Sequence, residues 1–124
     1  MEKIHILQIE DDAVNAQLIQ YVLEKEWSEC IVQTVGNASE GLEIAGKEKP
    51  DLIILDWSLP DMLGTEALKC IQMDDELKHI PVILFVYDPF GPINSLFDPV
   101  VRFMKPVNLK LFVECVREVL ETES

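Results

Sequence analysis

The stretch PDLIILDWSLPDMLG, from Pro50 to Gly64, is the part of the sequence most informative about its architecture. Its first half is a continuous apolar run that ends at Asp56, and a turn rich in proline and glycine follows. Such a run is typical of a strand buried on both faces, as in a parallel sheet. We therefore predict a strand over Asp51–Trp57 that carries a carboxylate at its end.

Strand-like and helical segments alternate on both sides of this stretch. Further strands are predicted at Lys3–Ile9, Cys30–Val35, Ile80–Tyr87 and Val100–Met104. Helices are predicted over residues 11–27, 37–49, 65–73 and 108–121, with Asp12, Asn37 and Asn108 as caps of three of them. The alternation predicts an α/β fold in which helices cover both faces of a parallel sheet.

The first predicted helix has a recurring apolar pattern. Val14, Leu18, Tyr21 and Val22 stand at helical spacing, with polar residues between them. This spacing predicts an amphipathic helix whose apolar face consists of these four side chains.

Composition restricts the function classes. The chain has 124 residues, which is enough for one domain with one core, and we expect a single domain over residues 1–124. Its formal net charge of −13 repels phosphate and anionic lipid, so we expect no direct nucleic acid binding. No apolar run is long enough to insert into a membrane, and the start lacks a signal-peptide pattern. The three cysteines are far apart in sequence, which favours a reducing, cytoplasmic location.

Charged side chains stand where several predicted strands end. Glu10, Asp11 and Asp12 follow the first strand, Asp56 ends the third, and Lys105 follows the fifth. The carboxyl ends of parallel strands meet at one edge, where such sheets bind ligands. Converging carboxylates repel one another unless a cation lies among them, and oxygen ligands suit Mg²⁺. The pattern predicts a site for Mg²⁺ and a phosphoryl group, although Glu10 and Asp12 could serve only as helix-terminal acids.

These motifs together resemble the receiver domain of two-component response regulators. ILQIEDDAVNAQL, NASEGLE, PDLIILDWSLPDMLGTE, IPVIL and FMKP stand in the family's order, and D-x-x-x-P-x-x-x-G is the most specific of the shared patterns. The resemblance implies a flavodoxin-like doubly wound (βα)₅ fold with a five-stranded sheet in the order 2-1-3-4-5. It also implies transfer of a phosphoryl group from a sensor histidine kinase or a phosphotransfer protein.

The resemblance also implies roles for individual residues. Asp56 corresponds to the phosphoacceptor, and Lys105 to the lysine that contacts a phosphoryl oxygen. For Mg²⁺, Asp56 and Asp11 correspond to direct ligands, Glu10 to one that acts through water, and Ser58 to a ligand through its backbone carbonyl.

The sequence departs from the family where phosphorylation is normally sensed. Val86 occupies the position of a threonine or serine and has no hydroxyl to bond the phosphoryl group. Arg102 replaces the usual switch aromatic, and Tyr87 stands where a small residue is common. Three prolines within residues 87–99 predict that the family's fourth helix is short, distorted or absent.

We first expect a phosphorylatable receiver with non-standard output toward an unknown downstream protein. It would be a signalling domain rather than an enzyme. The alternative is a pseudo-receiver that acts as an interaction module without phosphorylation. A hydrolase with Asp56 as nucleophile is disfavoured, because we find no second acid or base in the sequence that is placed to release the phosphoryl group.

Overall fold

The computed structural model describes residues 3–86, 100–104 and 108–122. Its strands are β1 (Ile4–Ile9), β2 (Cys30–Val35), β3 (Leu52–Asp56), β4 (Val82–Val86) and β5 (Val100–Met104). Its helices are α1 (Ala13–Glu26), α2 (Ala38–Glu48), α3 (Gly64–Gln72) and α4 (Leu109–Thr122). Residues 87–99, in which the family's fourth helix was expected to be short, distorted or absent, lie outside the described residues. Helix α4 is therefore the one predicted near the C-terminus.

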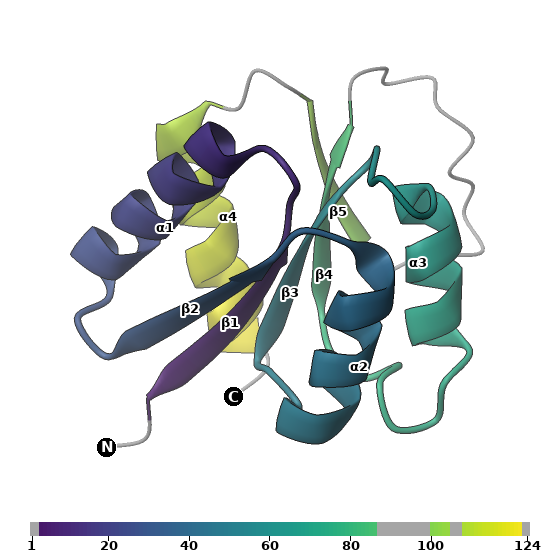
Figure 1. The fold of residues 1–124 in the computed structure, drawn as a ribbon. Coiled ribbons are helices and arrows are strands. Elements are labelled where there is room, and N and C mark those ends of the chain that lie inside the picture. The colour runs from purple at the N-terminus through teal and green to yellow at the C-terminus, as the bar shows by residue number, and fades with distance from the viewer. Residues whose placement is uncertain (1–2, 87–99, 105–107, 123–124) are drawn as a thin grey trace.

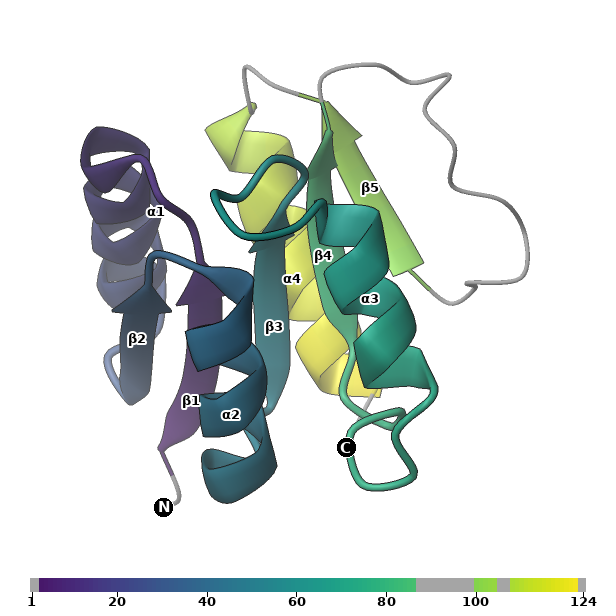
Figure 2. The ribbon, with the colours of Figure 1, turned by 45° about the vertical axis from the view of Figure 1, so that its right-hand side comes forward.

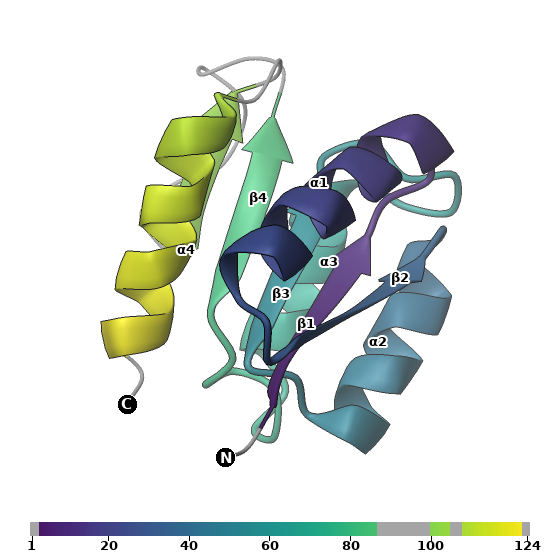
Figure 3. The ribbon, with the colours of Figure 1, turned by 90° about the vertical axis from the view of Figure 1, so that its left-hand side faces the viewer.

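The strands form one parallel sheet with helices on both faces. Their order is β2-β1-β3-β4-β5, so the chain winds outward from β1 in both directions (Figure 1). Helices α2 and α3 cover one face (Figure 2), and α1 and α4 cover the other (Figure 3). The predicted doubly wound α/β architecture with a parallel sheet is therefore confirmed.

Strand β3 is buried along its whole length, which explains its continuous apolar sequence. Ile53 and Leu55 pack into the core beneath α2 and α3. Leu52 and Ile54 pack into the core on the opposite face, which includes Phe112 of α4. A central strand of a doubly wound sheet contributes to two cores, which explains why both faces of β3 are apolar.

The register of β1 and β3 determines what lies at the carboxyl edge of the sheet. Ile9 pairs with Leu55 in parallel register. Glu10 and Asp56 follow these paired residues directly, so two acidic side chains leave neighbouring strands at the same level. This is the edge at which open α/β sheets bind ligands.

The prediction for the apolar face of α1 was wrong. Val14, Leu18 and Tyr21 are 78%, 45% and 62% exposed, whereas Ala16, Ile19 and Leu23 are buried. The helix carries two apolar stripes at helical spacing, and periodicity alone does not choose between them. The buried stripe begins with the small Ala16, which lets α1 approach the sheet closely.

The predicted helix caps are confirmed. Asp12 accepts hydrogen bonds from the amides of the first turn of α1, Asn37 accepts one from Glu40, and Asn108 accepts one from Leu111. Among the residues described, no helix combines the length and apolar character needed to cross a membrane.

Candidate functional site

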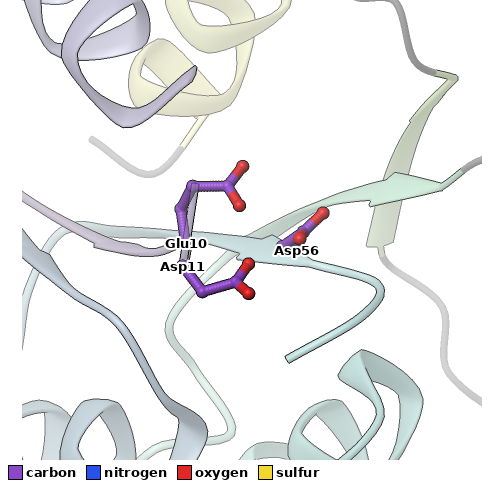
Figure 4. Close-up of side chains that lie close together, drawn as sticks. All are labelled: Glu10, Asp11 and Asp56. Carbon is purple, nitrogen blue, oxygen red and sulfur yellow. The ribbon is translucent and has the colours of Figure 1, made fainter. Parts of the chain in front are cut away.

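Three carboxylates meet at the carboxyl edge of the sheet. Each of Glu10, Asp11 and Asp56 offers an oxygen, and these oxygens lie within 4.8 Å of one another. Figure 4 shows the three side chains close together at the ends of β1 and β3. Glu10 and Asp56 are buried, with only 4% and 3% of each residue exposed, whereas Asp11 is exposed.

This arrangement is electrostatically costly without a cation. Like charges a few ångströms apart repel one another, and burial of two of them strengthens the repulsion. A hard divalent cation with oxygen ligands relieves it, and the exposed side of Asp11 leaves room for water ligands. The carboxylates present therefore fit Mg²⁺.

Local hydrogen bonds hold the first side of the site, at the junction of β1 and α1. The side-chain amide of Asn15 donates to Oε1 of Glu10 at 2.5 Å. The backbone N–H of Asp12 lies 3.3 Å from Oε2 of the same carboxylate. Asp12 itself caps α1 by accepting from the amides of Val14 and Asn15 at 3.0 and 3.1 Å. The buried Glu10 carboxylate is thus engaged on both of its oxygens by the turn that follows it.

The second side of the site is the connection between β3 and α3. Ser58 and Leu63 form an isolated antiparallel bridge, and the N–H of Gly64 donates to the carbonyl of Trp57 at 2.6 Å. A Cβ atom at Gly64 would lie 2.4 Å from the carbonyl oxygen of Asp56. Only glycine permits this approach of backbone to backbone. The last element of the D-x-x-x-P-x-x-x-G pattern therefore closes the loop onto the acidic residue that starts it.

A long-range contact also anchors this loop. The carboxylate of Asp61 accepts hydrogen bonds from the N–H groups of Ala38 and Ser39, both at 2.8 Å. These two residues form the first turn of α2. The bonds from Ala38 and then Ser39 lower the pKa of Asp61, because they favour its charged form.

The residues predicted for phosphorylation sensing are only partly described. Val86 is buried at the end of β4, one position beyond Phe85, which pairs with Asp56. Arg102 lies within β5, where it pairs with Leu84. Tyr87 and Lys105 lie outside the described residues.

The sequence prediction missed one residue that contacts the acidic cluster, Asn15, and one that anchors the loop beside it, Asp61. Asn15 lies five positions after Glu10 in the first turn of the helix, and a donor facing back to the strand end could have been suspected there. Nothing in the local sequence marks Asp61, because the N–H groups that it accepts from, those of Ser39 and Ala38, are 22 and 23 residues away. Ser58 lies in the loop between Asp56 and Asp61, as the pattern predicts.

The comparisons with known proteins agree with this geometry. The model of the response regulator receiver domain matches residues 6–88. The polar-differentiation response regulator DivK of Brucella anthropi is 38% identical over 78 residues, which cover 63% of this chain and 62% of that protein. The alignment thus spans less than two thirds of that relative's length.

Solved structures share the fold over nearly the whole chain. A CheY-like response regulator receiver domain protein from Methanospirillum hungatei has a TM-score of 0.85 and 28% identity, over 98% of this chain and 97% of that one. The receiver domain of a sensor histidine kinase from Pseudomonas aeruginosa, solved with a magnesium ion in its active site cleft, has a TM-score of 0.83 and 20% identity, over 96% and 98% of the two chains. The family model covers the chain from Ile6, within β1, past the end of β4, and includes all three clustered carboxylates. The chain therefore belongs to the response regulator receiver domain family.

Proposed function

We propose that this chain accepts a phosphoryl group on Asp56, in a Mg²⁺-dependent reaction, from a sensor histidine kinase or a phosphotransfer protein. The strongest support for the proposal is that Asp56 lies within a cluster of three carboxylates at the edge of the sheet where such folds bind ligands. Receiver domains are signalling domains, so the output is a change in binding to another protein rather than a released product.

The chemistry requires one nucleophilic oxygen and compensation for charge. A carboxylate oxygen of Asp56 forms a bond to phosphorus while the bond from phosphorus to the donor atom breaks, and the donor group leaves with the electron pair. Bound Mg²⁺ supplies neutralisation of the phosphoryl oxygens.

The surrounding residues would orient the reacting groups. Asp11, Asp56 and the Ser58 carbonyl would bind the cation directly, and Glu10 would do so through water. The two donors that already engage Glu10 support this indirect role. Lys105 would pair with a phosphoryl oxygen from the end of β5. We place the whole chain, residues 1–124, in this one receiver domain, working in the cytoplasm without binding nucleic acid.

The test is covalent labelling with a small phosphodonor. The protein is incubated with Mg²⁺ and phosphoramidate, and its intact mass is measured. We expect one phosphoryl adduct that requires Mg²⁺ and disappears in Asp56→Asn. Absence of an adduct, together with absence of Mg²⁺ affinity, would support the interaction module instead. Turnover of many donor equivalents would indicate a hydrolase.

The buried apolar side chain of Val86 is the observation that favours non-standard output. Valine matches threonine in shape but offers no hydroxyl, so a phosphoryl group on Asp56 cannot draw the end of β4 toward itself by a side-chain hydrogen bond. In Val86→Thr we expect larger phosphorylation-dependent chemical-shift changes in β4 and β5 than in the natural protein. Equal changes in both proteins would show that the missing hydroxyl does not limit switching.

A further inference from the structure

Glu10 is one of the two buried carboxylates of the cluster, and both of its oxygens have donors in the first turn that follows β1. It is 4% exposed, and its carboxylate is contacted from the first turn of α1. The amide of Asn15 donates to Oε1, and the N–H of Asp12 approaches Oε2. A long, flexible acidic side chain is therefore held at both oxygens.

We propose that Asn15 is a positioning residue for the cation site: its side-chain amide orients the Glu10 carboxylate toward Asp11 and Asp56. This inference rests on the proposed Mg²⁺-dependent function. Asn15 would not touch the cation or the phosphoryl group, and would act only through Glu10.

The chemistry of an amide suits this task. A hydrogen bond to a charged acceptor is stronger and more directional than one between neutral groups, so it fixes the rotation of the carboxylate. Each carboxylate oxygen has further lone pairs, which remain available to a water or a cation. The amide is also neutral, so it adds no positive charge to compete with the cation. Groups that orient ligands in this way commonly change metal affinity by about 10- to 100-fold when they are removed.

Helix formation does not explain Asn15. Asp12 already caps α1 and accepts from the backbone N–H of Asn15. Asparagine inside a helix is less favourable than leucine by a few tenths of a kcal/mol. A residue chosen only for the helix would therefore be a better helix former, whereas the observed side chain turns its amide toward an acidic group.

Helix propensity and the hydrogen bond to Glu10 favour different residues at position 15, and the variant Asn15→Leu tests them against each other. Leucine has a similar size and favours the helix, which offsets part of the cost of removing the amide donor from the buried Glu10 carboxylate, so the protein should remain folded. Mg²⁺ affinity, measured by titration of the fluorescence of Trp57 beside Asp56, should fall about tenfold or more. Phosphorylation by phosphoramidate should slow at low Mg²⁺ and recover at saturating Mg²⁺. Asn15→Ala tests the same loss without a larger side chain.

Gln20→Leu is the matched control. Gln20 lies on the same helix, and its amide also donates to a carboxylate, that of Glu24, at 3.2 Å on the exposed surface. This variant loses the same kind of bond away from the site, so its Mg²⁺ affinity should remain that of the natural protein. Unchanged Mg²⁺ affinity in both Asn15 variants overturns the inference.

A metal-free measurement separates this inference from the proposed function. In the natural protein the side-chain amide signals of Asn15 should exchange slowly with water, and Glu10→Ala should shift them while leaving those of Gln20 in place. If the Asn15 side-chain amide signals do not shift in Glu10→Ala, the inference fails, whatever the labelling of Asp56 shows. If Mg²⁺ binds and its affinity falls in the Asn15 variants, but no phosphoryl adduct forms, the proposed function fails and the inference stands.

Discussion

The two sides of the acidic cluster are held by different kinds of contact. At the junction of β1 and α1, the contacts to Glu10 come from residues two and five positions away. Between β3 and α3, the loop is anchored by Asp61 to the start of α2, 22 and 23 residues back in the sequence. One side is thus specified by its own turn, and the other only after β2 and β3 have paired with β1 on its two edges, which places α2 beside the loop that follows β3.

The difference separates two properties of the site. The local side determines how the Glu10 carboxylate is presented, so changes there should act mainly on cation binding. The long-range side determines where the loop carrying Asp56 and Ser58 lies, so changes there should act on the stability and the position of the acceptor. Four predictions test this separation.

Gly64→Ala should have the largest effect. Its new Cβ would meet the Asp56 carbonyl oxygen at 2.4 Å and Trp57 Cα at 2.9 Å, and both are backbone atoms that cannot turn away. We expect a loss of about 3 kcal/mol in the free energy of unfolding, measured by urea denaturation, together with weaker labelling of Asp56.

Gly46→Ala provides the control for this change. Gly46 lies in α2, and a Cβ there would meet nothing within 4 Å. This substitution should stabilise the protein by about 0.5–1 kcal/mol through its helix propensity. Equal effects of the two glycine substitutions would contradict the close approach at Gly64.

Asp12→Ala should act on the local side through the helix alone. It removes the acceptor for the amides of Val14 and Asn15, which should lower the free energy of unfolding by about 1 kcal/mol. The bond from Asn15 to Glu10 remains, so Mg²⁺ affinity should fall less than in Asn15→Leu. A larger fall in Asp12→Ala would mean that the cap, rather than the amide, orients Glu10.

Asp61→Ala should loosen the long-range side. We expect faster amide hydrogen exchange at Ala38, at Ser39 and in the loop before Gly64, because the carboxylate links these segments. Asn37→Ala removes a cap of the same helix, at Glu40, without touching the loop. It should speed exchange only in α2. If the loop exchanges faster in both variants, the effect of Asp61→Ala comes from the loss of a helix cap and not from a tether to the loop.

The same contact predicts a small pH effect. Hydrogen bonds from Ala38 and Ser39 lower the pKa of Asp61 in the folded protein, so its contribution is present above the ordinary aspartate value and is lost as the pH falls through the lowered one. The difference in free energy of unfolding between the natural protein and Asp61→Ala should therefore be constant above about pH 5 and shrink below about pH 4. A difference independent of pH would exclude a role for the charge.

The sequence predicted the parts of the site that depend on short-range pattern. The buried run before Asp56 and the cap at Asp12 follow from local chemistry, and parallel pairing then brings Glu10 and Asp56 to one edge. The tether from Asp61 could not be predicted, because its donors belong to another helix. The buried stripe of α1 was missed for a related reason: Ala16, Ile19 and Leu23 are selected by the sheet beneath them, not by their periodicity.

Gln8 helps to determine which face of α1 packs against the sheet. It is fully buried in β1, and its amide donates to the carbonyl of Ala16 and to Oγ1 of Thr34, both at 3.1 Å. A helix with two apolar stripes could in principle roll and bury Leu18 and Tyr21 instead. That alternative would take the Ala16 carbonyl away from the buried amide and leave it only the Thr34 hydroxyl, at a cost of about 1–3 kcal/mol for the lost acceptor. A polar group in the core thus acts against a competing packing of the same sequence, and it keeps Asn15 on the side of the helix that faces Glu10.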